Sequence, residues 1–185
     1  MIERLIIAYQ ILQEVRQLHA VDKIVHGDLK AGNIMIKGKG ADIVVKLVDF
    51  DFAAKKRGTV GFAAPEVVRQ GKYSKKSDIY AIRSLLYAIN EDQLFKNGQI
   101  SSALYELFQK THAQDPEARP EIDQLISGVK DELIAIRKKI TNKNQIETIS
   151  HFLEKIDESS EDSALLSSIE AGDEDYVAKR RKLCS

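Results

Sequence analysis

Hydrophobic residues recur every three or four positions in several long stretches of the chain, which is the spacing of a helix with one buried face. In the first stretch these residues are Leu5, Tyr9, Leu12 and Val15. A later stretch, SDIYAIRSLLYAI, is mostly apolar all round and predicts a buried helix. On this pattern we expect helices at residues 2–20, 77–89, 100–111, 121–140 and 145–156.

Two short β-rich runs lie between the first two helical stretches. They are NIMI, beginning at Asn33, and DIVVKLV, ending at Val48, and the turn-forming stretch KGKGAD separates them. This arrangement predicts a hairpin over residues 33–48, followed by an irregular segment at 49–66 that is closed by Pro65. We therefore expect a mainly α fold, α+β overall, with one small β-hairpin that carries a polar loop.

The charge balance narrows the possible partners and surroundings. Lys plus Arg and Asp plus Glu number 28 each, so there is no basic excess that would indicate nucleic acid. No apolar run approaches the roughly 18 residues that a membrane helix needs, so we expect no membrane span. Cys184 is the single cysteine, which excludes a disulfide framework and fits a cytoplasmic location.

Charge is distributed unevenly toward the end of the sequence. Residues 156–178 hold eight acidic residues, five serines and no basic residue, which is typical of a solvated, mobile tail. The KRRK that follows at 179–182 matches a nuclear import signal, but a solvated charge run explains it more simply. We expect a folded domain over 1–140, an additional helix over 141–156 and a flexible tail over 157–185.

The loop VHGDLKAGNIMI, at residues 25–36, concentrates side chains suited to phosphoryl transfer. That reaction needs a carboxylate that orients the attacking hydroxyl, oxygen ligands for magnesium, and a cation beside the transferring group. Asp28, Asn33 and Lys30 are of these types, and Asp49 follows the predicted hairpin. Because a hairpin brings its two ends together, the spacing is compatible with a metal site shared by Asn33 and Asp49.

Five stretches of the sequence resemble, in order, the motifs of eukaryotic-type Ser/Thr protein kinases. They resemble the catalytic loop, the magnesium-binding Asp-Phe-Gly motif, the end of the activation segment, the buried central helix and a late helix start with an Arg-Pro pair. The stretches are HGDLKAGN, VDFDFA, GTVGFAAPE, SDIYAIRSL and DPEARPEIDQLI. With the flanking helices the resemblance covers roughly residues 1–140, and it implies the fold of the kinase C-terminal lobe.

The resemblance implies a role in the chemistry for each matching residue. Asp28 would be the catalytic base, and Lys30 would contact the γ-phosphate of ATP. Asn33 and Asp49 would bind magnesium together with the nucleotide. Thr59 would bond the catalytic Asp and Lys, and with Lys30 it favours serine or threonine over tyrosine as the acceptor.

Four further matches imply structural roles. His26 would pack against the backbone, and Asp78 would hold the backbone of the catalytic loop. Glu66 and Arg119 would form a buried ion pair that ties the activation segment to the lower helices. Loss of one partner of such a pair costs several kcal/mol, so these residues are expected to affect folding rather than chemistry.

The sequence departs from the kinase motifs at three positions. Gly27 replaces the usual Arg of His-Arg-Asp, which removes the usual partner of an activation-loop phosphate. Asp51 replaces the Gly of Asp-Phe-Gly, and Gly tolerates backbone angles that are costly for other residues. Arg83 stands where the central helix usually has Gly.

The kinase amino-terminal lobe has no counterpart in the sequence. The glycine-rich loop, the strand lysine and the helix glutamate that hold the ATP phosphates from above do not occur in it. In such an open site the phosphates face water, where electrostatic stabilisation is weak. We therefore expect the 185-residue chain alone to bind ATP poorly and to transfer phosphate negligibly.

Three functions are compatible with these features. The first is a Ser/Thr protein kinase that acts on protein substrates with Mg-ATP once an amino-terminal lobe is supplied. The second is a lone C-terminal lobe that binds a partner protein through its exposed upper face. The third is a small-molecule phosphotransferase, because HGD and DFD also resemble the aminoglycoside and choline kinases, although GTVGFAAPE and DPEARP are not expected in that group.

Overall fold

The computed structural model describes most of the chain. The described residues are 1–48, 61–90 and 98–165. Asp49, Asp51 and Thr59, which the sequence singled out, lie outside the described residues, as does the stretch 166–185.

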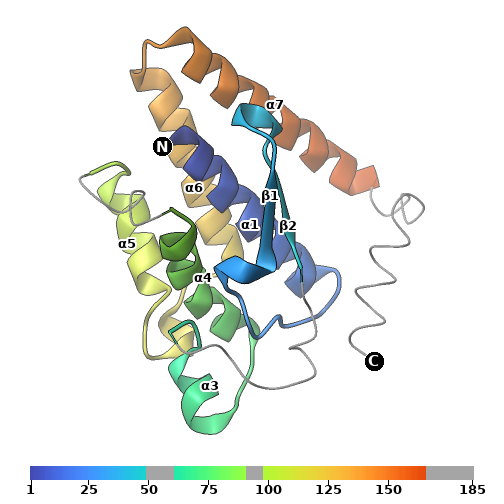
Figure 1. Cartoon of the computed structure of the whole chain (residues 1–185), viewed down its shortest axis with the longest axis vertical. Helices are drawn as coiled ribbons and strands as arrows, with labels where there is room; N and C mark the ends of the chain where they lie inside the picture. Colours follow the sequence, from blue (N-terminus) through green and yellow to red (C-terminus); the bar gives the residue numbers. More distant parts are fainter. Residues whose placement is uncertain (49–60, 91–97, 166–185) are drawn as a thin grey trace.

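Helices make up most of the described structure, and two strands form a small antiparallel sheet (Figure 1). The helices are α1 Ile2–Ala20, α3 Pro65–Gln70, α4 Lys75–Asn90, α5 Ser102–Lys110, α6 Ile122–Lys139 and α7 Lys143–Leu165. The strands are β1 Ile34–Lys37 and β2 Val44–Leu47, and the register pairs Ile34 with Leu47. Three short 3₁₀ turns complete the described elements, η1 Ala31–Asn33, η2 Gly40–Asp42 and η3 Pro116–Ala118. The prediction of a mainly α fold with one small hairpin is confirmed.

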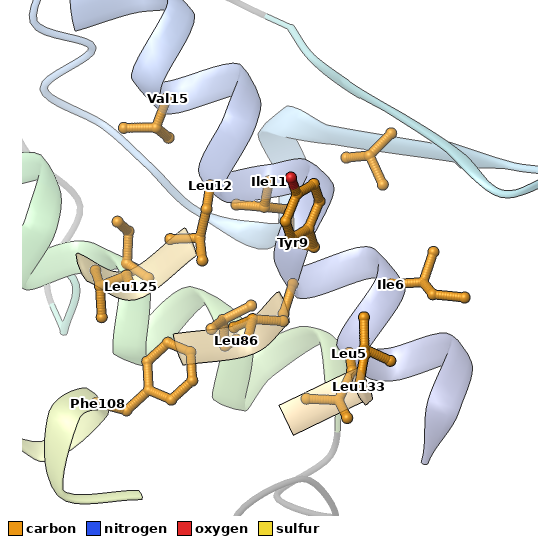
Figure 2. Close-up of a cluster of buried hydrophobic side chains, with 14 of the residues drawn as sticks. Leu5, Ile6, Tyr9, Ile11, Leu12, Val15, Leu86, Phe108, Leu125 and Leu133 are labelled. Carbon is orange, nitrogen blue, oxygen red and sulfur yellow. The ribbon is translucent and has the colours of Figure 1, made fainter. Parts of the chain in front are cut away.

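Helix α1 lies at the centre of the hydrophobic core. It contacts α6, α4, α7 and strand β2, and its side chains face Leu86 of α4, Phe108 of α5 and Leu125 of α6 (Figure 2). The expected single apolar stripe is therefore wrong for α1, because partners on several sides bury residues over most of its surface. Burial of this many large side chains is the main favourable term in folding.

A glutamine on α1 fixes the hairpin against the helix. The side chain of Gln10 donates to the carbonyl of Ile43 at 2.6 Å and accepts from the amide of Val45 at 3.0 Å. One amide thus satisfies two backbone groups at the edge of β2 that the hairpin ladder leaves open. The hairpin, and the polar loop that precedes it, are consequently held at a fixed place on α1.

Helix α7 packs on the core as well. The Phe152 ring meets Tyr9 of α1 edge to face, with ring centroids 5.5 Å apart, and Lys155 pairs with Asp42 of η2 at 2.6 Å. Figure 1 shows α7 running past the outer end of the hairpin. In the described part of the chain, no helix combines the length and apolar character needed to cross a membrane.

The element boundaries agree with the sequence pattern in some places and differ in others. The α1 helix begins and ends where predicted, and α4, α5 and α6 lie within a few residues of the predicted stretches. The segment expected to be irregular ends in a short helix, α3, which Pro65 begins and Gly71 ends. Helix α7 runs to Leu165, past the expected boundary at 156.

Candidate active site

The polar loop before the hairpin is held by one buried carboxylate. Asp78, in the first turn of α4, accepts the backbone N–H of His26 at 2.8 Å and that of Gly27 at 2.9 Å. Its side chain is 1% exposed. A buried carboxylate is stable only when several donors replace its water, and two of these donors belong to the loop. The loop backbone is therefore fixed relative to α4.

A third donor to Asp78 comes from α1. The ring Nε2 of His19 lies 2.8 Å from Asp78 Oδ2, and both side chains are almost fully buried. No role for His19 was expected from the sequence. The sequence does contain a signal that His19 is buried. It follows Val15 by four positions and therefore lies on the same buried side of α1.

Three side chains of the loop meet at its centre. Lys30 Nζ donates to Asp28 Oδ2 at 2.6 Å, and Asn33 Nδ2 donates to the backbone carbonyl of Asp28 at 3.0 Å. His26 is fully buried, and its Nδ1 lies 3.3 Å from the amide nitrogen of Asp28. Asp28 is thus surrounded by an ammonium group, an amide and an imidazole. A carboxylate beside an ammonium group is suited to orienting a hydroxyl and binding phosphate.

The donor set at Asn33 fits a magnesium site with few protein ligands. The Nδ2 of Asn33 donates to the carbonyl of Asp28, whereas its Oδ1 has no hydrogen bond among the described residues. Amide oxygens of this kind are ligands that Mg²⁺ prefers. The bond from the amide of Val48 to the carbonyl of Asn33, 2.9 Å long, closes the base of the hairpin. Asp49 comes next in the sequence, but its position lies outside the described residues.

The described ranges contain no cluster of three or more His, Cys, Asp or Glu side chains that could hold a metal. Among the described side chains, Asn33 could therefore contribute one ligand to a magnesium ion that is otherwise held by phosphates and water. Mg²⁺ is commonly held in this way, with one or two protein side chains, substrate phosphates and water.

Gly27, which stands where the kinase His-Arg-Asp motif has Arg, adopts a backbone conformation that favours glycine. Its φ is +78°, in the left-handed region that favours glycine. A Cβ at this position would lie 3.0 Å from Cδ1 of Tyr73, closer than ordinary van der Waals contact. The Tyr73 ring therefore covers the side of the loop where a larger residue would project, a contact that sequence reasoning missed.

The Glu66–Arg119 ion pair ties α3 to the segment before α6. Arg119 forms two parallel bonds to the Glu66 carboxylate, at 2.7 and 2.8 Å, and donates to the carbonyls of Lys76 and Ala113. Its guanidinium lies 4.9 Å from the ring centroid of Tyr80. The bonds and the aromatic face satisfy a guanidinium that is only 2% exposed.

The pKa of Glu66 responds to two opposing effects. Burial on its own raises the pKa, but the hydrogen bonds and positive charge of Arg119, with a backbone hydrogen bond, outweigh it and hold the pKa below its ordinary value. The carboxylate of Glu66 therefore remains ionised in the folded protein at neutral pH.

A small cavity lies beside Asp28. Its volume is about 10 Å³, near the minimum for one water molecule. Gly27, Asp28 and Leu29 of the loop line it from one side, and Phe62 lies among the residues that line it from the segment before α3. The segment that Glu66 anchors thus reaches the loop that carries Asp28.

Comparison with known proteins agrees with this geometry. A family model described as a protein kinase domain matches residues 3–156. The chain is 41% identical over 92 residues to serine/threonine-protein kinase ppk6 of Schizosaccharomyces pombe, a match that covers 45% of this chain and 11% of that protein.

Two further relatives are calcium/calmodulin-dependent protein kinases type II. The Caenorhabditis elegans protein is 32% identical over 136 residues, which is 64% of this chain and 19% of the relative. The Drosophila melanogaster alpha chain is 27% identical over 172 residues, which is 80% of this chain and 32% of the relative. The chain therefore spans a third or less of the length of these curated relatives.

The Gly27–Tyr73 contact predicts that Gly27→Ala destabilises the protein. The left-handed φ alone costs a residue with a Cβ about 1–2 kcal/mol, and pressure on the Tyr73 ring adds to it. Gly71→Ala is the matched control, because Gly71 has φ +63° and no atom within 4 Å of an added Cβ. Urea unfolding should show a larger loss for Gly27→Ala, and Tyr73→Ala should remove the excess. Equal losses at the two glycines would contradict the contact.

The Glu66–Arg119 pair predicts how stability depends on pH. Because the pKa of Glu66 is lowered in the folded state, its stabilising contribution is complete above the ordinary carboxyl pKa and is lost as the pH falls through the lowered value. Glu66→Gln should cost about 3 kcal/mol at neutral pH, since it leaves Arg119 buried without a charged partner.

Melting temperatures of wild type and Glu66→Gln, measured from pH 7 to pH 3, should therefore converge as the pH falls. Glu106→Gln, which changes an exposed glutamate of α5, serves as the control and should follow wild type. A wild-type advantage that stays constant down to pH 3 would show that the charge of Glu66 does not contribute.

Proposed function

The chain belongs to the protein kinase family, and on that basis we propose that it transfers the γ-phosphoryl group of Mg-ATP to serine or threonine hydroxyls of proteins. The observation that carries the proposal is the Asp28–Lys30 pair, with 2.6 Å between Oδ2 and Nζ, on a loop whose backbone Asp78 holds. Positioning and electrostatics are most of what phosphoryl transfer asks of a protein, and the loop supplies both.

Asp28 is the proposed base. As the acceptor oxygen forms its bond to the γ-phosphorus, the bond from that phosphorus to the bridging oxygen of ADP breaks, and the Asp28 carboxylate takes the hydroxyl proton. Lys30 bonds the same carboxylate and carries the positive charge that stabilises the transferring group. The Asp28 side chain is 0% exposed here, so the side chains that cover it must move before a hydroxyl can reach it.

Asn33 and Asp49 are the proposed protein ligands of magnesium. The ion, when bound with ATP, neutralises the charge that develops on the phosphates. Asn33 is suited to this because its Nδ2 is anchored on the Asp28 carbonyl, which couples the position of the ligand oxygen to that of the base. The glycine-rich loop and lysine that kinases place over the phosphates would act with these groups from another segment or another polypeptide.

The acceptor is proposed to be serine or threonine. The relatives include proteins named as serine/threonine kinases and calcium/calmodulin-dependent protein kinases. Lys30, and Thr59 outside the described residues, are the residue types that the resemblance associates with these acceptors.

The direct test is phosphate transfer by the natural gene product that contains these residues. With Mg²⁺ and γ-labelled ATP, it should label serine and threonine peptides, and Asp28→Asn should lower kcat by roughly 10²–10⁴-fold while leaving the melting temperature near wild type. Asp131→Asn, the same exchange at an exposed position of α6, is the control and should keep full activity.

Other outcomes separate the remaining functions. Label that appears on a small alcohol and is not reduced by competing peptides would identify a small-molecule phosphotransferase. Absence of transfer to any acceptor, with a partner protein retained equally by wild type and Asp28→Asn, would identify a binding module and contradict the proposed reaction.

A further inference from the structure

An open groove with a volume of about 560 Å³ lies next to the cavity beside Asp28, and Phe62 lines both. We call it the Arg83 groove. Its lining residues are Arg83, Ser84, Tyr87 and Ala88 of α4, Gly61 and Phe62 before α3, and His112 after α5. The groove is large enough for a side chain of a bound peptide.

Arg83 gives this groove a positive charge that no carboxylate in the described part of the chain compensates. No carboxylate among the described residues pairs with it, and its Nε is buried without a hydrogen-bond acceptor. The contact found for its guanidinium in the described structure is the face of Tyr87, 5.3 Å from the ring centroid. A guanidinium with donors to spare and an aromatic support is arranged to bind an anion.

The other described groups of the groove do not cancel this charge. None of the described residues that line it is Asp or Glu. Ser84 Oγ lies 3.1 Å from His112 Nε2, and the imidazole stacks on Tyr80. Burial first, and then the charges of Arg83 and Arg119, lower the pKa of His112, so this side chain is neutral near pH 7. The groove therefore offers one fixed cation and one hydroxyl–imidazole pair.

The position of the groove links it to the reacting end of the site. Phe62 lines the cavity beside Asp28 and also lines the Arg83 groove. A peptide whose hydroxyl lies at Asp28 can therefore reach the groove with a nearby side chain. Because Arg83 stands where the kinase motif usually has Gly, the charge is a particular feature of this chain.

We propose that the Arg83 groove binds an anionic side chain, a carboxylate or a phosphate, of the protein substrate whose hydroxyl is placed at Asp28. Arg83 is then a specificity-determining residue, and the substrates are serine or threonine segments with an acidic residue close to the acceptor. This inference rests on the proposed kinase function and names its substrate class.

The test is a set of peptides that share one serine and carry Asp, Glu, phosphoserine, Gln or Lys at each flanking position. For the natural gene product, one or two positions should favour the anionic residues by about tenfold in KM, with kcat unchanged. Arg83→Gln should abolish the preference, and Arg83→Glu should shift it toward Lys. The Asp and phosphoserine peptides distinguish a carboxylate from a phosphate.

Arg69→Gln is the matched control. It removes the same charge from an exposed arginine of α3 that does not line the groove, and the preference should remain. An anionic preference that survives Arg83→Gln, or that Arg69→Gln removes equally, would overturn the assignment.

A binding measurement keeps this inference separate from the proposed reaction. The same peptides with alanine in place of the serine can be labelled and followed by fluorescence anisotropy, which needs no transfer. Tighter binding of the anionic peptides, lost in Arg83→Gln, supports the groove whether or not transfer is seen. Equal binding of all peptides overturns it even if serine is phosphorylated, and absence of transfer with selective binding contradicts the proposed reaction alone.

Discussion

The buried carboxylate of Asp78 is the interaction on which the site depends. Its oxygens accept from the backbone of His26 and Gly27 and lie within hydrogen-bond distance of the His19 ring. A carboxylate that is removed from water without such partners would strongly destabilise the fold, so the three donors and Asp78 must be arranged together. One consequence is that the loop bearing Asp28 is attached to the hydrophobic core through α1 and α4 and not only to its sequence neighbours. The close contact of Asp28 and Lys30 is built on that attachment.

Helix α4 supports each part of the site in turn. Its first turn holds the loop that carries Asp28 through Asp78. The next residues place the ring of Tyr80 against the guanidinium of Arg119. Arg119 in turn holds Glu66 and thereby the segment whose Phe62 lies beside both the Asp28 cavity and the Arg83 groove. The apolar residues of α4 meanwhile belong to the core. A single buried helix therefore links the stability of the fold to the position of Asp28 and to the charge in the Arg83 groove.

Local patterns in the sequence were sufficient to predict most helices and strands. They were not sufficient to predict contacts between distant segments. Periodicity located α1 and α4, and turn residues located the hairpin, because these signals depend on near neighbours. The buried faces of α1 could not be predicted in the same way, since they depend on where other helices pack. The bond between His19 and Asp78 spans 59 positions and has no spacing rule. The pairing of Glu66 with Arg119 was expected from the family resemblance alone.

Amide hydrogen exchange at His26 and Gly27 tests the central claim most directly, because these two N–H groups are the loop's bonds to Asp78. If the buried carboxylate holds the loop, both amides should exchange as slowly as those in the middle of α4, at rates set by global unfolding. If they exchange as fast as the amide of Lys23, an exposed residue just before the loop, Asp78 does not fix the loop, and the account of the site is wrong.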